Sequence, residues 1–138
     1  MIQLIIGEKG KGKTKILLDR ANKAMKEANG NIVYLDKSKQ HMYELNNRIR
    51  LIDVTAYPIT NSDAFIGYLC GLISRDNDLE QIFLDSFLKI AKQDGADISP
   101  VLDQIRNLSD TYHVDFTISI SVKEQDLPEQ FKEFVISD

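Results

Sequence analysis

The stretch GEKGKGKT at residues 7–14 constrains the fold most, because it follows the apolar run 2–6 and precedes a helix-like segment. It fits the pattern G-x-x-x-x-G-K-[ST] without a gap, ending in Lys13 and Thr14. A loop of this kind wraps phosphates with backbone N–H groups, and its glycines must be free to adopt positive φ angles. The lysine then reaches the β- and γ-phosphates, while the hydroxyl serves Mg²⁺. The pattern therefore predicts a strand, a phosphate-binding loop and a helix in succession.

The alternative interpretation is a lysine-rich surface turn that matches the pattern by composition alone. Such a match should arise by chance in roughly one of a few hundred chains of this size, given average glycine usage. Its position between a strand and a helix further favours phosphate binding. We therefore predict that a nucleotide is held by the loop and its flanks, namely Gly7, Glu8, Lys9, Gly10, Lys11, Gly12, Lys13, Thr14 and Lys15.

The remaining chain alternates between strand-like and helix-like segments. Strands are predicted at residues 2–6, 31–35, 48–54, 81–85 and 115–122, with a closing strand at 134–137. Helices are predicted at residues 15–29, 38–46, 63–74 (with Ser62 as N-cap), 87–92 and from Ser99-Pro100 onward. This alternation predicts a single α/β domain over residues 1–138, a three-layer sandwich whose mainly parallel sheet has five or six strands.

An aspartate at the end of an apolar strand commonly holds Mg²⁺ beside such a loop. Asp85, which follows Ile82-Phe83-Leu84, has this character, although it could instead cap the following helix. Asp36 is the competitor, because it ends the strand that follows the first helix. The predicted metal ligands are Thr14 and Asp85.

On these residues the chain resembles the P-loop NTPase superfamily, specifically its RecA/ASCE-like branch, and is similar to small single-domain bacterial ATP-binding proteins. Gly7, Gly12, Lys13 and Thr14 match the Walker A motif, and Asp85 matches the Walker B aspartate. The resemblance implies ATP as ligand with Mg²⁺ as cofactor. It also implies the strand order 5-1-4-3-2, with residues 115–121 inserted between the Walker A and Walker B strands and residues 134–137 flanking the first strand.

The resemblance further implies that Ser119 or Ser121 points from the inserted strand toward the γ-phosphate as a sensor. The alternative is an ordinary polar strand face that these serines share with Thr117. Relatives in this branch commonly place a glutamate after the Walker B aspartate to polarise water. Here Ser86 follows, and Glu80 stands at the far end of the strand. The sequence thus supports nucleotide binding better than hydrolysis.

The favoured function is Mg²⁺-dependent binding of a nucleoside triphosphate, with the protein acting as a switch or a slow ATPase that works with a partner. Two alternatives stay open. One is a small-molecule P-loop kinase, although such kinases usually need an arginine-bearing lid and the arginines of this chain do not cluster in a loop. The other is a degenerate P-loop module used for interaction. Residues 63–74 are apolar nearly all round, which predicts burial or a protein partner, or a second copy of the chain. Arg75 could then act across that contact. No guanine-reading N-K-x-D stretch is present, and the choice of base stays open.

Bulk properties narrow the function classes. The net charge of −4 and the pI of about 5.2 give no general attraction to nucleic acid or anionic membranes. No apolar run approaches the ~20 residues that span a bilayer, and the single Cys70 suits a reducing compartment. We therefore expect a cytoplasmic protein with no membrane span.

Overall fold

The computed structural model describes residues 1–10 and 12–136 of the chain, and its centre is one all-parallel sheet. The five strands are β1 (Ile2–Ile6), β2 (Asn31–Asp36), β3 (Arg50–Asp53), β4 (Leu79–Leu84) and β5 (Asp115–Ile120). They lie in the order β1-β5-β4-β2-β3, and every neighbouring pair is parallel. The predicted α/β class with a parallel sheet is confirmed.

The predicted strand order 5-1-4-3-2 is wrong. β5 does lie between β1 and β4, as expected, but residues 134–136 add no strand beside β1, which is therefore an edge strand, and β3 extends the sheet beyond β2 at the opposite edge. The burial of β2 and β3 agrees with these positions. Five of the six residues of β2 are buried, which suits a strand covered on both faces, whereas β3 begins with an exposed residue and has one buried position.

The predicted closing strand at residues 134–137 is also wrong for its described part. Glu129–Phe134 forms a 3₁₀-helix, η4, which buries Phe131 completely. Only an isolated bridge joins Val135 to Leu4 of β1, supported by a hydrogen bond from Ile136 N to Leu4 O of 2.9 Å. Residue 137 lies outside the described residues. The need to bury Phe131 outweighs strand pairing here, and β1 remains at the edge.

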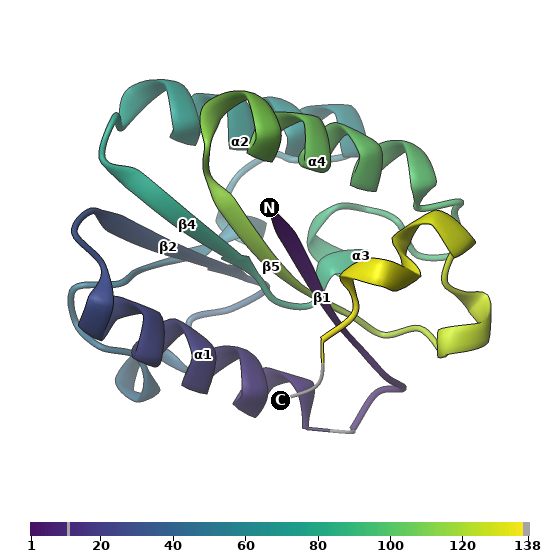
Figure 1. Ribbon diagram of the computed structural model, residues 1–138, viewed down its shortest axis with the longest axis horizontal. Helices are drawn as coiled ribbons and strands as arrows, with labels where there is room; N and C mark the ends of the chain where they lie inside the picture. The colour runs from purple at the N-terminus through teal and green to yellow at the C-terminus, as the bar shows by residue number, and fades with distance from the viewer. Residues whose placement is uncertain (11, 137–138) are drawn as a thin grey trace.

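Helices cover both faces of the sheet (Figure 1). α1 (Lys13–Glu27) lies below the sheet in this view, while α2 (Ser62–Arg75) and α4 (Ser99–Tyr112) lie side by side above it. The short α3 (Phe87–Ile90) follows β4 directly. The arrangement has the three layers that the sequence predicted. None of the described helices is long and apolar enough to cross a membrane.

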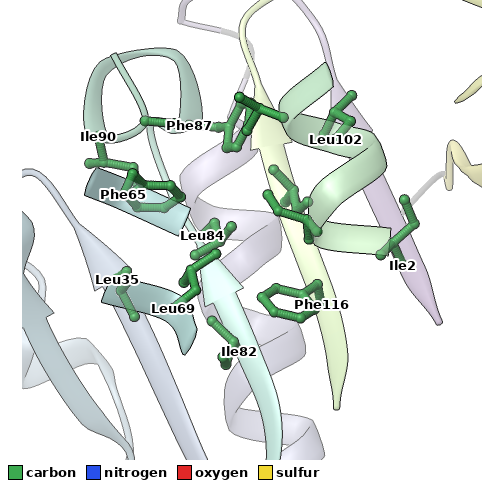
Figure 2. Close-up of a cluster of buried hydrophobic side chains, with 14 of the residues drawn as sticks. Ile2, Leu35, Phe65, Leu69, Ile82, Leu84, Phe87, Ile90, Leu102 and Phe116 are labelled. Atoms are coloured by element: carbon green, nitrogen blue, oxygen red, sulfur yellow. The ribbon is translucent and has the colours of Figure 1, made fainter. Parts of the chain in front are cut away.

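Two apolar clusters hold these layers together. The larger one lies between the sheet and the α2–α4 layer, and Figure 2 shows part of it, with Phe65 and Leu69 of α2 and Leu102 of α4 meeting Ile82 and Phe116 of the strands. The smaller cluster packs α1 on the opposite face through Leu17, Leu18, Ala21 and Met25. Because both faces are covered, most strand positions are apolar, although β5 also carries the buried polar residues Thr117 and Ser119.

Several predicted element boundaries shift. α2 is capped by Asn61, whose side chain accepts from Ala64 N at 2.8 Å, so Ser62 is the first helical residue and not the cap. The helix predicted at residues 38–46 is reduced to a 3₁₀ turn, Met42–Glu44. The larger apolar side chains of α2 pack toward the core. Its exposed residues are Asp63 and Arg75 near the two ends and, between them, the small residues Gly67, Cys70, Gly71 and Ser74.

Candidate functional site

The glycine-rich loop (residues 7–14) links the carboxyl end of β1 to α1, where parallel α/β sheets bind ligands. Gly10 and Gly12 adopt φ angles of 81° and 78°, and Gly12 directly precedes the first turn of α1. A side chain at either position would meet nothing within 4 Å, so the backbone conformation, and not lack of space, calls for glycine. Lys11, one of the predicted nucleotide-binding residues, lies outside the described residues.

Lys13 is buried, and its Nζ donates to the backbone oxygen of Glu8 at 2.9 Å. Burial lowers the pKa of Lys13, while the negative charge of Asp85 acts in the opposite direction. The side chain of Lys13 therefore folds back across its own loop. It also lies close enough to Asp85, the predicted metal ligand, to feel its charge.

The carboxylate of Asp85 is the centre of the site, and it is only 3% exposed. Its Oδ1 accepts hydrogen bonds from Ser86 N at 2.8 Å, Ser119 Oγ at 2.9 Å and Thr14 Oγ1 at 3.3 Å. Its Oδ2 accepts from Tyr34 OH at 2.7 Å. The sequence-predicted residues Thr14, Asp85 and Ser119 thus meet at one carboxyl group.

Tyr34 is the residue of this network that the sequence did not reveal. It lies in β2, is fully buried and stacks on Phe83 of β4 with ring centroids 6.3 Å apart. Burial, and then the charge of Asp85 and the hydrogen bond to it, raise the pKa of Tyr34. The phenol therefore stays protonated and donates to Asp85. The only signal in the sequence was a tyrosine within the otherwise apolar run NIVYL.

Ser86 directly follows Asp85, and its backbone is unusual. It has φ 54° and ψ 47°, the left-handed region that non-glycine residues seldom adopt. In this conformation its N–H reaches both Asp85 Oδ1 and Ser119 Oγ, the latter at 3.2 Å. Such strain persists only where the surroundings hold it in place, as these two acceptors do here.

The two candidate sensor serines have different surroundings. Ser119 is buried within β5 and its hydroxyl is engaged by Asp85. Ser121 lies just beyond the strand and lines the pocket in front of the loop. The polar face that the alternative interpretation expected is therefore divided: Ser119 supports Asp85, and Ser121 faces open space.

A pocket of about 440 Å³ lies in front of the loop. It is lined by Lys9, Gly10, Gly12, Lys13, Thr14, Lys37, Asp85, Ser86, Ser119 and Ser121. Lys15, also predicted to bind nucleotide, does not line it: its side chain is largely exposed on α1 and contacts Asp19 at 3.5 Å. Gly7 does not line it either, and Glu8 instead lines an adjoining pocket of about 590 Å³.

The adjoining pocket shares Lys9, Lys37, Ser86 and Ser121 with the first one. The two pockets therefore lie next to each other at the carboxyl ends of the strands. An ion pair between Glu8 and Lys123, 3.5 Å long, joins the two sides of the larger pocket.

The donor set suits Mg²⁺ in one respect. Mg²⁺ sites built with nucleotides use one or two carboxylates and leave the other positions to phosphates and water, and Asp85 with Thr14 offers a carboxylate and a hydroxyl. A cation between these groups requires the Thr14 hydroxyl to turn its hydrogen away from Asp85. Among the described residues no three His, Cys, Asp or Glu side chains gather to form an all-protein metal site.

Asp36 is the second buried carboxyl group, at 3% exposure, and ends β2 one strand away from Asp85. Its Oδ1 accepts from Lys37 N at 2.7 Å. Burial, followed by repulsion from Asp85, raises the pKa of Asp36 to about 6. It lines neither of the two pockets, so the structure does not bring it to the predicted ligand.

No protein-family model matches this chain, and no curated protein does either. The site must therefore be interpreted from its own geometry.

The pKa of Asp36 leads to a test by pH. The folded protein binds this proton more tightly than the unfolded chain, so the group favours folding at low pH, and this contribution is lost as pH rises through about 6. In metal-free buffer, wild type should lose about 2 kcal/mol of unfolding free energy relative to the Asp36→Asn variant between about pH 4 and pH 7. Urea denaturation across this range measures it. A pH-independent difference would contradict the expectation, and Asp103→Asn on α4 is the exposed control.

A second test concerns the Tyr34–Asp85 hydrogen bond. Tyr34→Phe leaves Asp85 Oδ2 buried without its donor and should lower the free energy of unfolding by about 1–3 kcal/mol. The matched control is Tyr43→Phe, since Tyr43 is 91% exposed and should change stability by less than ~0.5 kcal/mol. Denaturant midpoints give both values, and equal stability of the two variants would show that the hydrogen bond contributes nothing.

Proposed function

We propose that this chain binds a nucleoside triphosphate with Mg²⁺, with ATP as the nucleotide, and acts as a nucleotide-dependent switch or slow ATPase with a partner. The observation that carries the proposal is the contact between Thr14 Oγ1 and Asp85 Oδ1, beside the buried Lys13 and a loop with left-handed glycines. This set brings together a cation, a hydroxyl, a carboxylate and the backbone of a glycine-rich loop. Few ligands other than a metal-bound polyphosphate require all four.

The loop residues would each take a distinct part in binding. Lys13 exchanges the oxygen of Glu8, a neutral acceptor, for a phosphate oxygen, which is a stronger partner for an ammonium group. The 15-residue helix α1 begins at Lys13 and directs the positive end of its dipole at the same place. Its first turn carries no acidic residue that would compete with the phosphates.

Hydrolysis has less support than binding. Ser86 has no carboxylate to orient water, and its N–H is committed to Asp85 and Ser119. Asp36 is buried and lines neither pocket. The lack of a carboxylate at Ser86 agrees with a switch, or with an ATPase whose catalytic site is completed by another protein.

Phosphoryl transfer to a small molecule is the second candidate, favoured by the adjoining pocket of about 590 Å³ beside Ser86 and Ser121. An acceptor there would lie next to the phosphates. A degenerate loop used purely for interaction is less well supported, because such a loop has no need to keep Lys13 and Thr14 beside Asp85.

For the partner, the outward row of α2 with Gly67 and Gly71 offers a surface of small residues over residues 63–74.

Replacing the loop lysine tests the binding proposal. Lys13→Ala should weaken Mg-ATP binding at least tenfold, or ~1.4 kcal/mol, because the phosphates lose their direct cation. Asp85→Asn should reduce the Mg²⁺ dependence of binding, while Asp36→Asn leaves it intact. Calorimetry measures the affinities, and Lys26→Ala, at the far end of the same helix, is the control. Equal affinity of wild type and Lys13→Ala would rule the proposal out.

The rate of hydrolysis is a separate test. The isolated chain should release phosphate from ATP well below the ~1 to 10³ s⁻¹ typical of enzymes, since loss of general-base assistance costs roughly 10²- to 10⁴-fold. Phosphate release is measured over a range of protein concentrations. A rate that rises with concentration would point to a group supplied by a second copy, such as Arg75. Rapid turnover independent of concentration would mean that the chain carries complete catalytic machinery, contrary to this prediction.

A further inference from the structure

A pocket at the opposite edge of the sheet has a different chemical character from the nucleotide site. It has a volume of about 360 Å³ and lies where β2, β3 and β4 begin and α2 ends. β2 and β4 begin on the left of Figure 1, far from the glycine-rich loop at the lower right. Its lining residues are Asn31, Ile32, Val33, Arg48, Arg50, Leu72, Arg75, Asp76 and Leu79.

Three of the five arginines in the chain line this one pocket. All three are exposed, and among the described residues none of them forms a salt bridge. Arg48 is held in place by a hydrogen bond from Nη2 to Met25 O of 3.2 Å, which ties it to the end of α1. Three like charges are therefore gathered in a chain whose net charge is −4.

The single acidic residue in the lining does not neutralise them. The carboxylate of Asp76 accepts from Asn31 Nδ2 at 2.8 Å through Oδ2 and from Asp78 N at 2.9 Å through Oδ1. Both of its oxygens thus serve to join the end of α2 to the start of β2. The guanidinium groups remain available to a ligand, and repulsion among them would be relieved by an anion.

We propose that this pocket binds a small molecule carrying a phosphate or carboxylate group, at a second site separate from the glycine-rich loop. Guanidinium groups pair with both oxyanions through two parallel N–H···O bonds, which a lysine cannot do. The volume falls within the ~300–1,000 Å³ range of ligand pockets, and Leu72 with the start of β2 supplies an apolar wall. The acidic remainder of the chain disfavours a long polyanion and favours a compact ligand.

This inference goes beyond nucleotide binding, and the test keeps the two sites apart. Inorganic pyrophosphate and citrate serve as the phosphate and carboxylate probes, titrated into the ¹⁵N-labelled full chain while amide NMR shifts are followed. Shifts are expected at Asn31, Arg50 and Arg75 with at least one probe. They should persist in the Lys13→Ala variant, whereas any shifts of Gly10 and Gly12 report on the loop. The probe that binds more tightly identifies the oxyanion.

The double variant Arg50→Gln/Arg75→Gln should weaken binding at this pocket at least tenfold. Both side chains are exposed, so the fold should be retained, which an unchanged melting temperature would show. The matched control Lys26→Gln/Arg106→Gln removes the same charge elsewhere and should leave the affinity within twofold. The proposal is overturned if neither probe shifts the pocket amides at a probe concentration on the order of 10 mM. It is also overturned if the two double variants weaken binding equally.

Discussion

The structure around the loop depends on the solvation of one buried carboxylate. An ionised side chain removed from water costs several kcal/mol unless hydrogen bonds replace its hydration. Asp85 obtains these bonds from Thr14 at the start of α1, Tyr34 of β2, Ser119 of β5 and the backbone of Ser86. Each donor comes from a different segment. Satisfying this one charge therefore holds the loop, three strands and the turn into α3 in a single arrangement.

The same dependence explains how a ligand at the loop could alter the rest of the molecule. The contact with Thr14 is the longest of the four, at 3.3 Å, and it is the one that a cation beside the loop would interrupt. Tyr34 and Ser119 hold the carboxylate from within the sheet, so they would keep it in position while Thr14 changes partner. In a switch built this way, the first step would be only a rotation of the Thr14 hydroxyl away from Asp85. The strained turn at Ser86, whose N–H donates to both Asp85 and Ser119, is the nearest segment that would change when Thr14 changes partner.

The sequence predicted what depends on local pattern. The order of strand, loop and helix, the parallel sheet and the position of Asp85 all follow from short stretches whose periodicity or spacing is unambiguous. What it missed depends on contacts between distant segments. Nothing local marks Tyr34 as the donor to Asp85, because their pairing arises only when β2 and β4 lie side by side.

The errors at the end of the chain have the same origin. The segment FVIS has strand-like composition, yet the 3₁₀-helix that ends at Phe134 buries Phe131, and in the described part of the segment a single bridge joins Val135 to β1. The pocket of arginines likewise could not be foreseen, because Arg75 stands 25 residues from Arg50 and meets it only through the packing of α2 on the sheet. The spacing of residues along the chain does not predict contacts between residues that are far apart in the sequence.

The pairing of β1 with β5 has a consequence for how the chain acquires its fold. Ile2 lies opposite Phe116, and β1 has no other strand beside it. During synthesis the glycine-rich loop thus emerges before its supporting strand, which is made only after β2, β3, β4 and the helices between them. Closing so long a loop is slow, because its entropy is lost before any contact compensates. β1 must therefore stay unpaired until β5 is made, and in that interval its apolar residues are open to aggregation or to chaperones.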